Sequence, residues 1–378
     1  MRRFGRQDGT GKPMQDAQHI RQLTGLRFFA AFWVVLFHYW PKMAGPAAPA
    51  FVEKGYLGVE LFFILSGFIL CHVYRTSVED GRFRYGGFLW NRLARIYPLH
   101  LATLAGMGVL ALGAAAAGMA VDGNILSWSS LPANLLLLHA WGFADTAAWN
   151  HPSWSISAEW FAYLTFPAFA WGAIRMKRRP MLAVALAAAF VVMLYAAFQR
   201  LSGFPLTQAT IAWGALRIVP CFAYGCALHA FWRAKPAHNQ LAALASVAVS
   251  AAATAAAAAF GAPDALIVVG LGIVILSLAR LAQCGSKLLA APPFVYLGEI
   301  SYSVYMVCIP WMIVFVNGAA KLLQLSDERL PLWLWLVFLF SVIPLSAASY
   351  HLIEKPARER MKLLAEAWGE RRPKAAEA

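Results

Sequence analysis

Hydrophobic residues in this chain are grouped into long runs separated by short polar segments. Runs of about 18–25 apolar residues predict membrane-spanning helices, because about 20 helical residues cross the ~30 Å hydrocarbon core of a bilayer. Ten such runs predict an all-α, polytopic bundle of about ten transmembrane helices. The runs cover residues 22–41, 56–74, 98–120, 154–174, 181–199, 211–232, 241–260, 264–280, 294–317 and 330–353.

Lys and Arg are distributed unevenly between alternate loops. With the N-terminus inside, the inner segments hold 25 of these residues and the outer segments hold 5. This asymmetry follows the positive-inside rule and predicts that both termini are cytoplasmic. We therefore expect an N-terminal tail (1–21), a membrane domain (22–358) and a C-terminal tail (359–378). The outer connection 121–153 contains "SLPANLLLLHAW", which is too short to span and predicts a re-entrant or interfacial segment.

The composition supports a membrane protein. Hydrophobic residues make up 60% of the chain and charged residues only 13%, against about 25% charged in soluble domains. The net charge of +14 is explained by inner loops, so no nucleic-acid partner is expected. The five cysteines lie in or beside apolar runs without metal-binding spacing, which predicts apolar fillers and no metal site. "AGPAAPA" after the first run is typical of a cleavage site, but nine further runs favour a retained span.

Ionisable residues interrupt several of the apolar runs. Such residues usually face a cavity or one another, because charge is costly in lipid. Arg27 and His38 are eleven residues apart, which places them on one helical face about 16 Å apart. The alternative is an Arg that extends to the headgroups and a His in the opposite interface. The full set is Arg27, His38, Glu60, Glu159, Arg217 and Glu299.

Two further motifs carry polar side chains. In "RLARIYP", Arg92 and Arg95 share a helical face, and paired guanidinium groups bind phosphate bidentately. Ordinary positive-inside charge is the alternative. In "WSISAEWFAY", Ser157 and Glu159 begin the fourth run. Helix capping and an aromatic interface belt explain most of that pattern without chemistry. Ser66–Gly67, in the middle of the second run, predicts close helix packing.

Six segments in order resemble the acyltransferase-3 family of membrane acyltransferases. They are "GLRFFAAFWVVLFH", "GYLGVELFFILSGF", "FLWNRLARIYPLH", "PSWSISAEWFAYLTFP", "LGEISYSVYMVCIPW" and "YHLIEKPAR". The chain looks like the stand-alone form, without the C-terminal esterase-like domain of some members. It departs from the family where Glu299 replaces a frequent Arg and where Val307–Cys308 replace a frequent Trp-His.

The resemblance implies acyl transfer from a cytoplasmic donor, commonly acetyl-CoA, to an extracytoplasmic sugar hydroxyl. The expected acceptor is an exopolysaccharide or a lipid-linked oligosaccharide, the expected location the bacterial inner membrane, and glycan-assembly proteins are possible partners. Arg92 and Arg95 would hold the nucleotide, and Arg27 would guide the pantetheine arm or hold a phosphate. His38 would act as general base or as nucleophile through an acetyl-imidazole.

The remaining expected residues surround the acyl group and the acceptor. Glu159, with Glu60 as the weaker candidate, would orient His38 or contact the sugar. Oxyanion donors would come from Ser157 and the indoles of Trp154 and Trp160. Tyr163 completes the expected substrate-binding set of Glu60, Ser157, Trp154 and Tyr163. The rival functions are a transporter or exporter and an acyl-passage subunit that serves another transferase.

Overall fold

The computed structural model describes residues 19–118, 126–325 and 329–370, and these residues are helical apart from loops and one isolated bridge between Met43 and Leu330. The predicted N-terminal tail falls largely outside this range, and the predicted C-terminal tail does so from residue 371 onward. The helices are α1 (Arg21–Tyr39), α2 (Ala50–Glu53), α3 (Gly58–Glu79), α4 (Tyr85–Ala116), α5 (Leu131–Leu135), α6 (Trp154–Leu164), α7 (Phe166–Arg175), α8 (Pro180–Ser202), α9 (Gly214–Ala234), α10 (Gln240–Ala259), α11 (Asp264–Gln283), α12 (Pro292–Glu299), α13 (Ser301–Leu323), α14 (Leu332–Ser349) and α15 (Lys355–Glu370).

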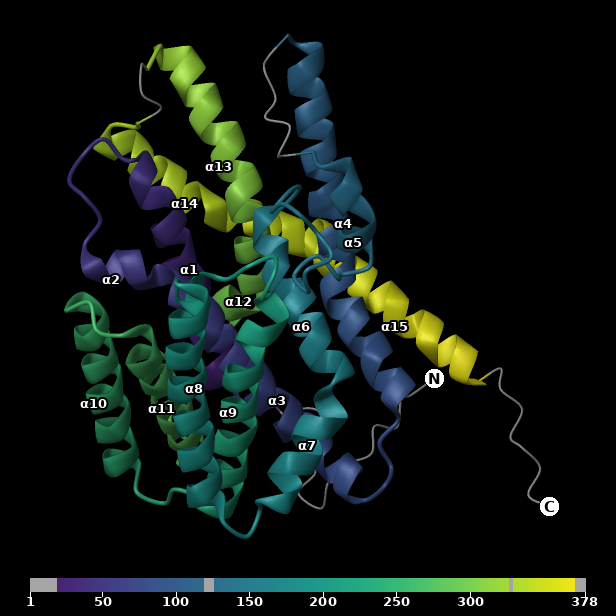
Figure 1. Ribbon diagram of the computed structural model, residues 1–378, viewed down its shortest axis with the longest axis vertical. Helices are drawn as coiled ribbons and strands as arrows, with labels where there is room; N and C mark the ends of the chain where they lie inside the picture. The colour runs from purple at the N-terminus through teal and green to yellow at the C-terminus, as the bar shows by residue number, and fades with distance from the viewer. Residues whose placement is uncertain (1–18, 119–125, 326–328, 371–378) are drawn as a thin grey trace.

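Among the described residues, nine helical segments are long and apolar enough to cross a membrane, and they overlap nine of the ten predicted runs. The all-α polytopic bundle is thereby confirmed. The remaining run, 154–174, is divided at Thr165 into α6 and α7. Pro167 explains the division, because a proline lacks an N–H and clashes with the carbonyl one turn earlier. Both halves pack against α9 and follow one another along the bundle (Figure 1).

Helices α3 and α9 form the centre of the bundle and approach very closely. A Cβ atom on Gly67 would lie 2.2 Å from the carbonyl oxygen of Phe222, and one on Gly225 would lie 2.0 Å from that of Ile64. Only glycine permits this backbone contact. The predicted packing role of Gly67 is therefore confirmed, whereas the neighbouring Ser66 donates a hydrogen bond to Glu159 on α6.

The ninth predicted run is also interrupted. Helix α12 ends at Glu299, and α13 begins at Ser301. Helix α1 packs against both pieces. Glu299 is exposed at this break, so it does not join the polar interior that its place in an apolar run had suggested.

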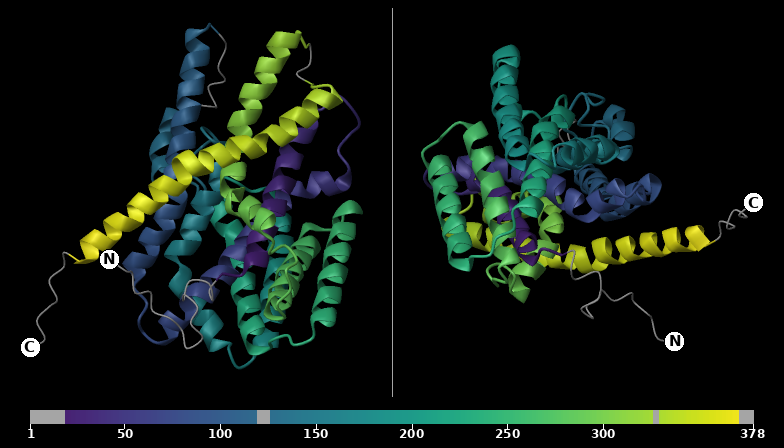
Figure 2. Two further views of the ribbon diagram at one scale, coloured as in Figure 1. Left: turned by 180° about the vertical axis from the view of Figure 1, so that it is seen from behind. Right: turned by 90° about the horizontal axis from the view of Figure 1, so that it is seen from below.

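The C-terminal helices form one long rod across the back of the bundle. Helix α14 continues through a π-helical turn, Tyr350–Glu354, into α15 (Figure 2). The indole of Trp90 on α4 donates a hydrogen bond to the carbonyl of Met361, at 2.8 Å, which attaches α15 to α4. Residues 359–370, expected to be part of a loose tail, instead continue this helix to Glu370.

The described part of the connection 121–153 packs onto the bundle and contains no spanning helix. It holds the five-residue α5 and two short 3-10 turns. The amide of Ala140 donates to Ser157 at 3.0 Å, and the side-chain amide of Asn150 donates to the carbonyl of Met306 at 3.0 Å. These bonds fix the loop against α6 and α13, next to the start of α6.

Candidate functional site

Two neighbouring cavities lie inside the bundle. The first, here the arginine cavity, has a volume of about 100 Å³, and the second, here the histidine cavity, has a volume of about 680 Å³. Val59 on α3 and Tyr305 on α13 line both cavities and therefore form the wall between them. The larger volume is within the usual range of small-molecule sites, and the smaller one is narrow.

Three cations and one carboxylate line the arginine cavity. Arg27 comes from α1, Arg92 and Arg95 from α4, and Glu159 from α6. The Glu159 carboxylate accepts a hydrogen bond of 2.6 Å from Ser66, which holds it against α3. The cations outnumber the carboxylate, so this cavity favours an anionic ligand.

Helix α15 adds two cations beside the same arginines. Lys362 lies within electrostatic reach of Arg92, Arg95 and Arg358. The Arg358 guanidinium is 3.8 Å from the carboxylate of Glu354, which also accepts a hydrogen bond of 2.8 Å from Ser303. The chain thus gathers basic side chains from α1, α4 and α15, three helices that are far apart in sequence.

The histidine cavity brings two imidazoles together. His38, near the end of α1, lies with its ring centroid 6.3 Å from that of His151, at an interplanar angle of 77°. His151 opens the 3-10 turn His151–Ser153 that leads directly into α6. Removal of water from around its ring lowers the pKa of His151 below 6.5. A neutral imidazole can accept a proton, so His151 is available to act as a base or to hydrogen-bond a ligand.

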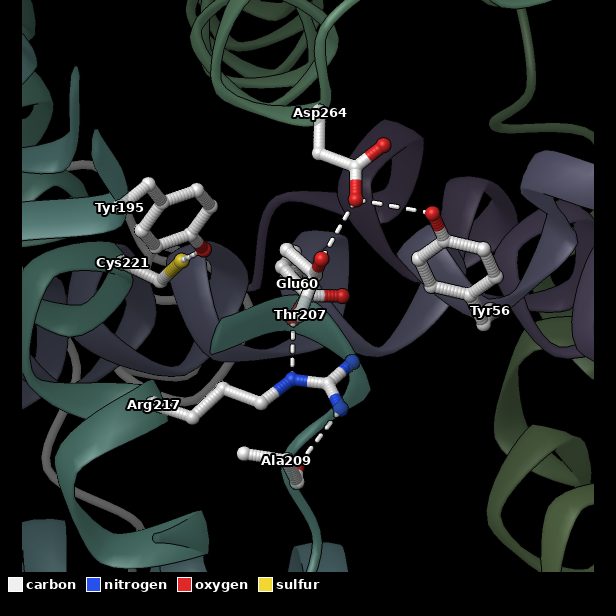
Figure 3. Close-up of polar contacts among 8 residues, drawn as sticks. All are labelled: Tyr56, Glu60, Tyr195, Thr207, Ala209, Arg217, Cys221 and Asp264. Carbon is white, nitrogen blue, oxygen red and sulfur yellow. Dashed lines mark hydrogen bonds and ion pairs between the residues drawn. The ribbon is translucent and has the colours of Figure 1, made fainter. Parts of the chain in front are cut away.

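Arg217 on α9 reaches the histidine cavity and is held by three contacts, of which Figure 3 shows the two hydrogen bonds. Its Nε donates to the Glu60 carboxylate at 2.5 Å, and its Nη1 donates to the Ala209 carbonyl at 2.9 Å. The guanidinium also lies 4.5 Å from the ring centroid of Trp154, in a cation–π contact. Glu60 is fully buried and lines neither cavity. It pairs with Arg217, and the role in substrate binding expected for Glu60 from the sequence stays a prediction.

A second polar cluster borders the same cavity. The Asp264 carboxylate accepts hydrogen bonds from Tyr56 at 2.8 Å and from Thr207 (Figure 3), and it also accepts one from Lys54 at 2.6 Å. Lys54, Tyr56 and Thr207 line the histidine cavity, whereas Asp264 lies behind them. The charges of Lys54 and Asp264 compensate each other, as do those of Arg217 and Glu60.

Several expected site residues lie elsewhere than predicted. Glu159 and Tyr163 line the arginine cavity and not the histidine cavity, so Glu159 does not lie in the cavity of His38. Ser157 is fully buried, donates to the Leu137 carbonyl at 2.7 Å and accepts from Ala140. That hydroxyl anchors the loop and is not available as an oxyanion donor.

The two candidate tryptophans differ in position. Trp154 lines the histidine cavity as expected, although its indole ring packs under Arg217. Trp160 lines neither of the two cavities. Residues of α6 line different cavities, or neither, because successive residues of a helix point in different directions. Residues five or more positions apart also lie more than one helical turn apart along the axis.

Sequence reasoning missed the imidazole beside His38. His151 precedes the "PSWSIS" motif directly, outside the predicted span, and only its place next to that motif could have drawn attention to it. Lys54 and Asp264 were also missed, because they stand at the edges of apolar runs where charged residues are common.

Comparison with known proteins places this geometry in context. A family model described as an acyltransferase domain, Acyl_transf_3, matches residues 20–351. The acyltransferase MdmB of Streptomyces mycarofaciens is 36% identical over 157 residues, which cover 39% of this chain and 38% of that protein. Protein 2 in the picA locus of Rhizobium radiobacter is 41% identical over 83 residues, or 22% of this chain and 41% of that protein. The chain thus spans about two fifths of each relative, and no solved structure matches it.

Proposed function

The chain belongs to this family of membrane acyltransferases, and from that premise we propose that it transfers an acetyl group from cytoplasmic acetyl-CoA to a saccharide hydroxyl across the membrane. The proposal rests on one observation: the arginine cavity and the histidine cavity are neighbours and share lining residues. One collects cations that suit a phosphorylated donor, and the other holds imidazoles in a space large enough for a sugar. The donor and the acceptor thus each have a cavity that fits their chemistry.

The donor occupies the arginine side in this proposal. Arg92 and Arg95 bind the phosphates of the coenzyme, since guanidinium groups bind phosphate through paired hydrogen bonds. Arg27 lies deeper, on α1, and guides the pantetheine arm through the narrow cavity. The arm is a long, slender chain, and a cavity of about 100 Å³ has room for its thiol end. The thioester then reaches the wall formed by Val59 and Tyr305.

The acceptor occupies the histidine side. Its hydroxyl lies beside His38, which takes the proton as the oxygen attacks the thioester carbon. The alternative route forms an acetyl-imidazole on His38 first and then transfers the acetyl group to the sugar. His151, 6.3 Å away between ring centroids, can receive or return a proton in either route. Bringing donor and acceptor into adjoining cavities supplies a large part of the rate through effective concentration.

The acceptor class follows from the family resemblance. An exopolysaccharide or a lipid-linked oligosaccharide is the acceptor in our proposal, in the inner membrane of a bacterium, where glycan-assembly proteins are the natural partners. Mass spectrometry of surface glycans from cells with and without the protein tests this. Loss of acetyl groups from one glycan identifies the acceptor, and an unchanged glycan profile contradicts the proposed class.

One observation favours a second function, transport. The breaks at Thr165 and Ile300 produce discontinuous helices, a feature that transporters place at their substrate sites. Purified protein in detergent and acetyl-labelled acetyl-CoA separate the two functions. An enzyme transfers or hydrolyses the label without any membrane gradient. Binding without release of the label favours transport or an acyl-passage subunit.

A further inference from the structure

Arg217 has one nitrogen without a hydrogen-bond partner. Its Nε and Nη1 are bonded to Glu60 and to the Ala209 carbonyl, whereas Nη2 is buried and unbonded. The whole side chain is 2% exposed and lines the histidine cavity. Unpaired donors of this kind are rare inside proteins, because their lost hydration is not replaced. A ligand oxygen in the cavity that Arg217 lines would supply the missing partner of Nη2.

The guanidinium is held in place before any ligand arrives. Glu60 and the Ala209 carbonyl fix two of its three nitrogens (Figure 3). Trp154 packs against its face. Each of these partners comes from a different segment, so the group cannot turn away without breaking several contacts. A donor fixed in this way costs no reorganisation when charge develops next to it.

We propose that Nη2 of Arg217 is the oxyanion donor of the transfer reaction. This inference rests on the proposed function. The acceptor oxygen forms a bond to the thioester carbon while His38 takes its proton, and the carbonyl oxygen becomes negative and accepts a hydrogen bond from Nη2. The C–S bond then breaks, the carbonyl reforms, and the leaving thiolate takes the proton from His38. The products are the acetyl ester and coenzyme A as its thiol.

The charges around the cavity favour this role over binding of an anionic acceptor. Arg217 is balanced by Glu60, and Lys54 is balanced by Asp264. Glu53 also lines the cavity, so no excess of positive charge remains for a resting anion. A polarised N–H donor held in a fixed position is instead most effective on charge that appears only in the transition state.

The test uses the protein in detergent. Water serves as the acceptor, and the measured reaction is the hydrolysis of acetyl-CoA. The double variant Arg217→Gln/Glu60→Gln replaces the ion pair by amides and leaves no buried unpaired charge. We expect kcat to fall by about 10²–10³-fold, as when an oxyanion donor is removed, with the Kd for coenzyme A unchanged within about threefold. Arg75→Gln/Glu79→Gln neutralises an ion pair of α3 that lines neither cavity and is the matched control, with kcat within about threefold of the wild type.

A binding measurement separates catalysis from folding. A trifluoromethyl ketone analogue of acetyl-CoA hydrates to a tetrahedral adduct, and the plain methyl ketone analogue does not. We expect the wild type to prefer the tetrahedral analogue by at least about tenfold and the Arg217→Gln/Glu60→Gln variant to lose that preference while it still binds the plain analogue. Equal preference in both proteins overturns the assignment of Arg217. A wild type that neither hydrolyses acetyl-CoA nor binds coenzyme A overturns the proposed function instead.

Discussion

Arg27 and His38 project from the same unbroken helix into two different cavities. Helix α1 runs from Arg21 to Tyr39, so the spacing of eleven positions between the two residues gives a fixed separation of about 16 Å along the axis. Arg27 lines the arginine cavity, and His38 lines the histidine cavity. One rigid element therefore sets the distance between Arg27 in the arginine cavity and the imidazole of His38 in the histidine cavity.

Removal of the imidazole of His38 tests the chemistry of the histidine cavity. We expect His38→Ala to lower acetyl-CoA hydrolysis and acetyl transfer by about 10²–10⁴-fold, because a positioned base contributes that much to the rate. The Kd for coenzyme A, measured by titration calorimetry, should stay within about threefold. His351→Ala, at an exposed histidine, is the control. A fully active His38→Ala protein contradicts the mechanism.

Removal of charge from the arginine cavity tests donor binding. Arg92→Gln/Arg95→Gln should weaken coenzyme A binding by about 10–100-fold for each lost charge-assisted contact, since such bonds contribute about 1.5–3 kcal/mol. The value of kcat at saturating donor should change little. The control is Arg360→Gln, at an exposed position of α15. It also removes one positive charge and should leave the affinity for coenzyme A unchanged. Equal losses in both proteins would indicate a general charge effect.

Acid should destabilise the loop that carries His139. This side chain is buried, and its Nε2 and the Ser153 hydroxyl form a hydrogen bond of 3.1 Å. Burial, with a smaller effect of His100, lowers its pKa from 6.5 to about 4. The folded protein thus binds fewer protons than the unfolded chain, so stability is retained above pH 6.5 and falls as the pH drops from 6.5 towards 4.

At pH 5 the expected loss from this one group is ~2 kcal/mol. Thermal unfolding in detergent between pH 7.5 and pH 5 measures it. His139→Gln removes the titrating ring, and the fall in Tm should become shallower even where its Tm at pH 7.5 is lower. An unchanged pH dependence in this variant contradicts the assignment of the loss to His139.

A methyl group at the closest contact of α3 and α9 should destabilise the bundle. Gly67→Ala places a Cβ 2.2 Å from a backbone carbonyl oxygen, which forces the two helices apart. We expect a loss of about 1–3 kcal/mol, typical of overpacking, seen as a lower Tm. Gly172→Ala, on α7 with open space around the added atom, is the control and should preserve or raise the Tm. Similar Tm values for both variants would contradict the packing argument.

The apolar runs were sufficient to predict the bundle, and one helix was sufficient to relate Arg27 to His38. Helical periodicity fixes which residues of one helix share a face. It contains no information about contacts between helices. The bond between Arg217 and Glu60 joins residues 157 positions apart, and the approach of His151 to His38 depends on how a loop folds back. Those relationships required the structure.

The interruptions of the predicted runs at Thr165 and Ile300 were not predicted, for a related reason. Hydropathy in the run 154–174 is continuous across Thr165, and Pro167 alone shows where the helix is interrupted. A proline can also be tolerated inside a helix of this bundle, as Pro98 in α4 shows. The local sequence therefore does not distinguish a break from a tolerated proline, and neighbouring packing decides the outcome.

Val59 and Tyr305 line both cavities, and under the proposed function this position has to meet two demands. The acyl group would pass between these side chains, whereas a bilayer that sustains a proton gradient has to stay electrically tight. The proposed function therefore requires that the acylated thiol fill the opening as it passes, so that acyl transfer proceeds without ion leakage.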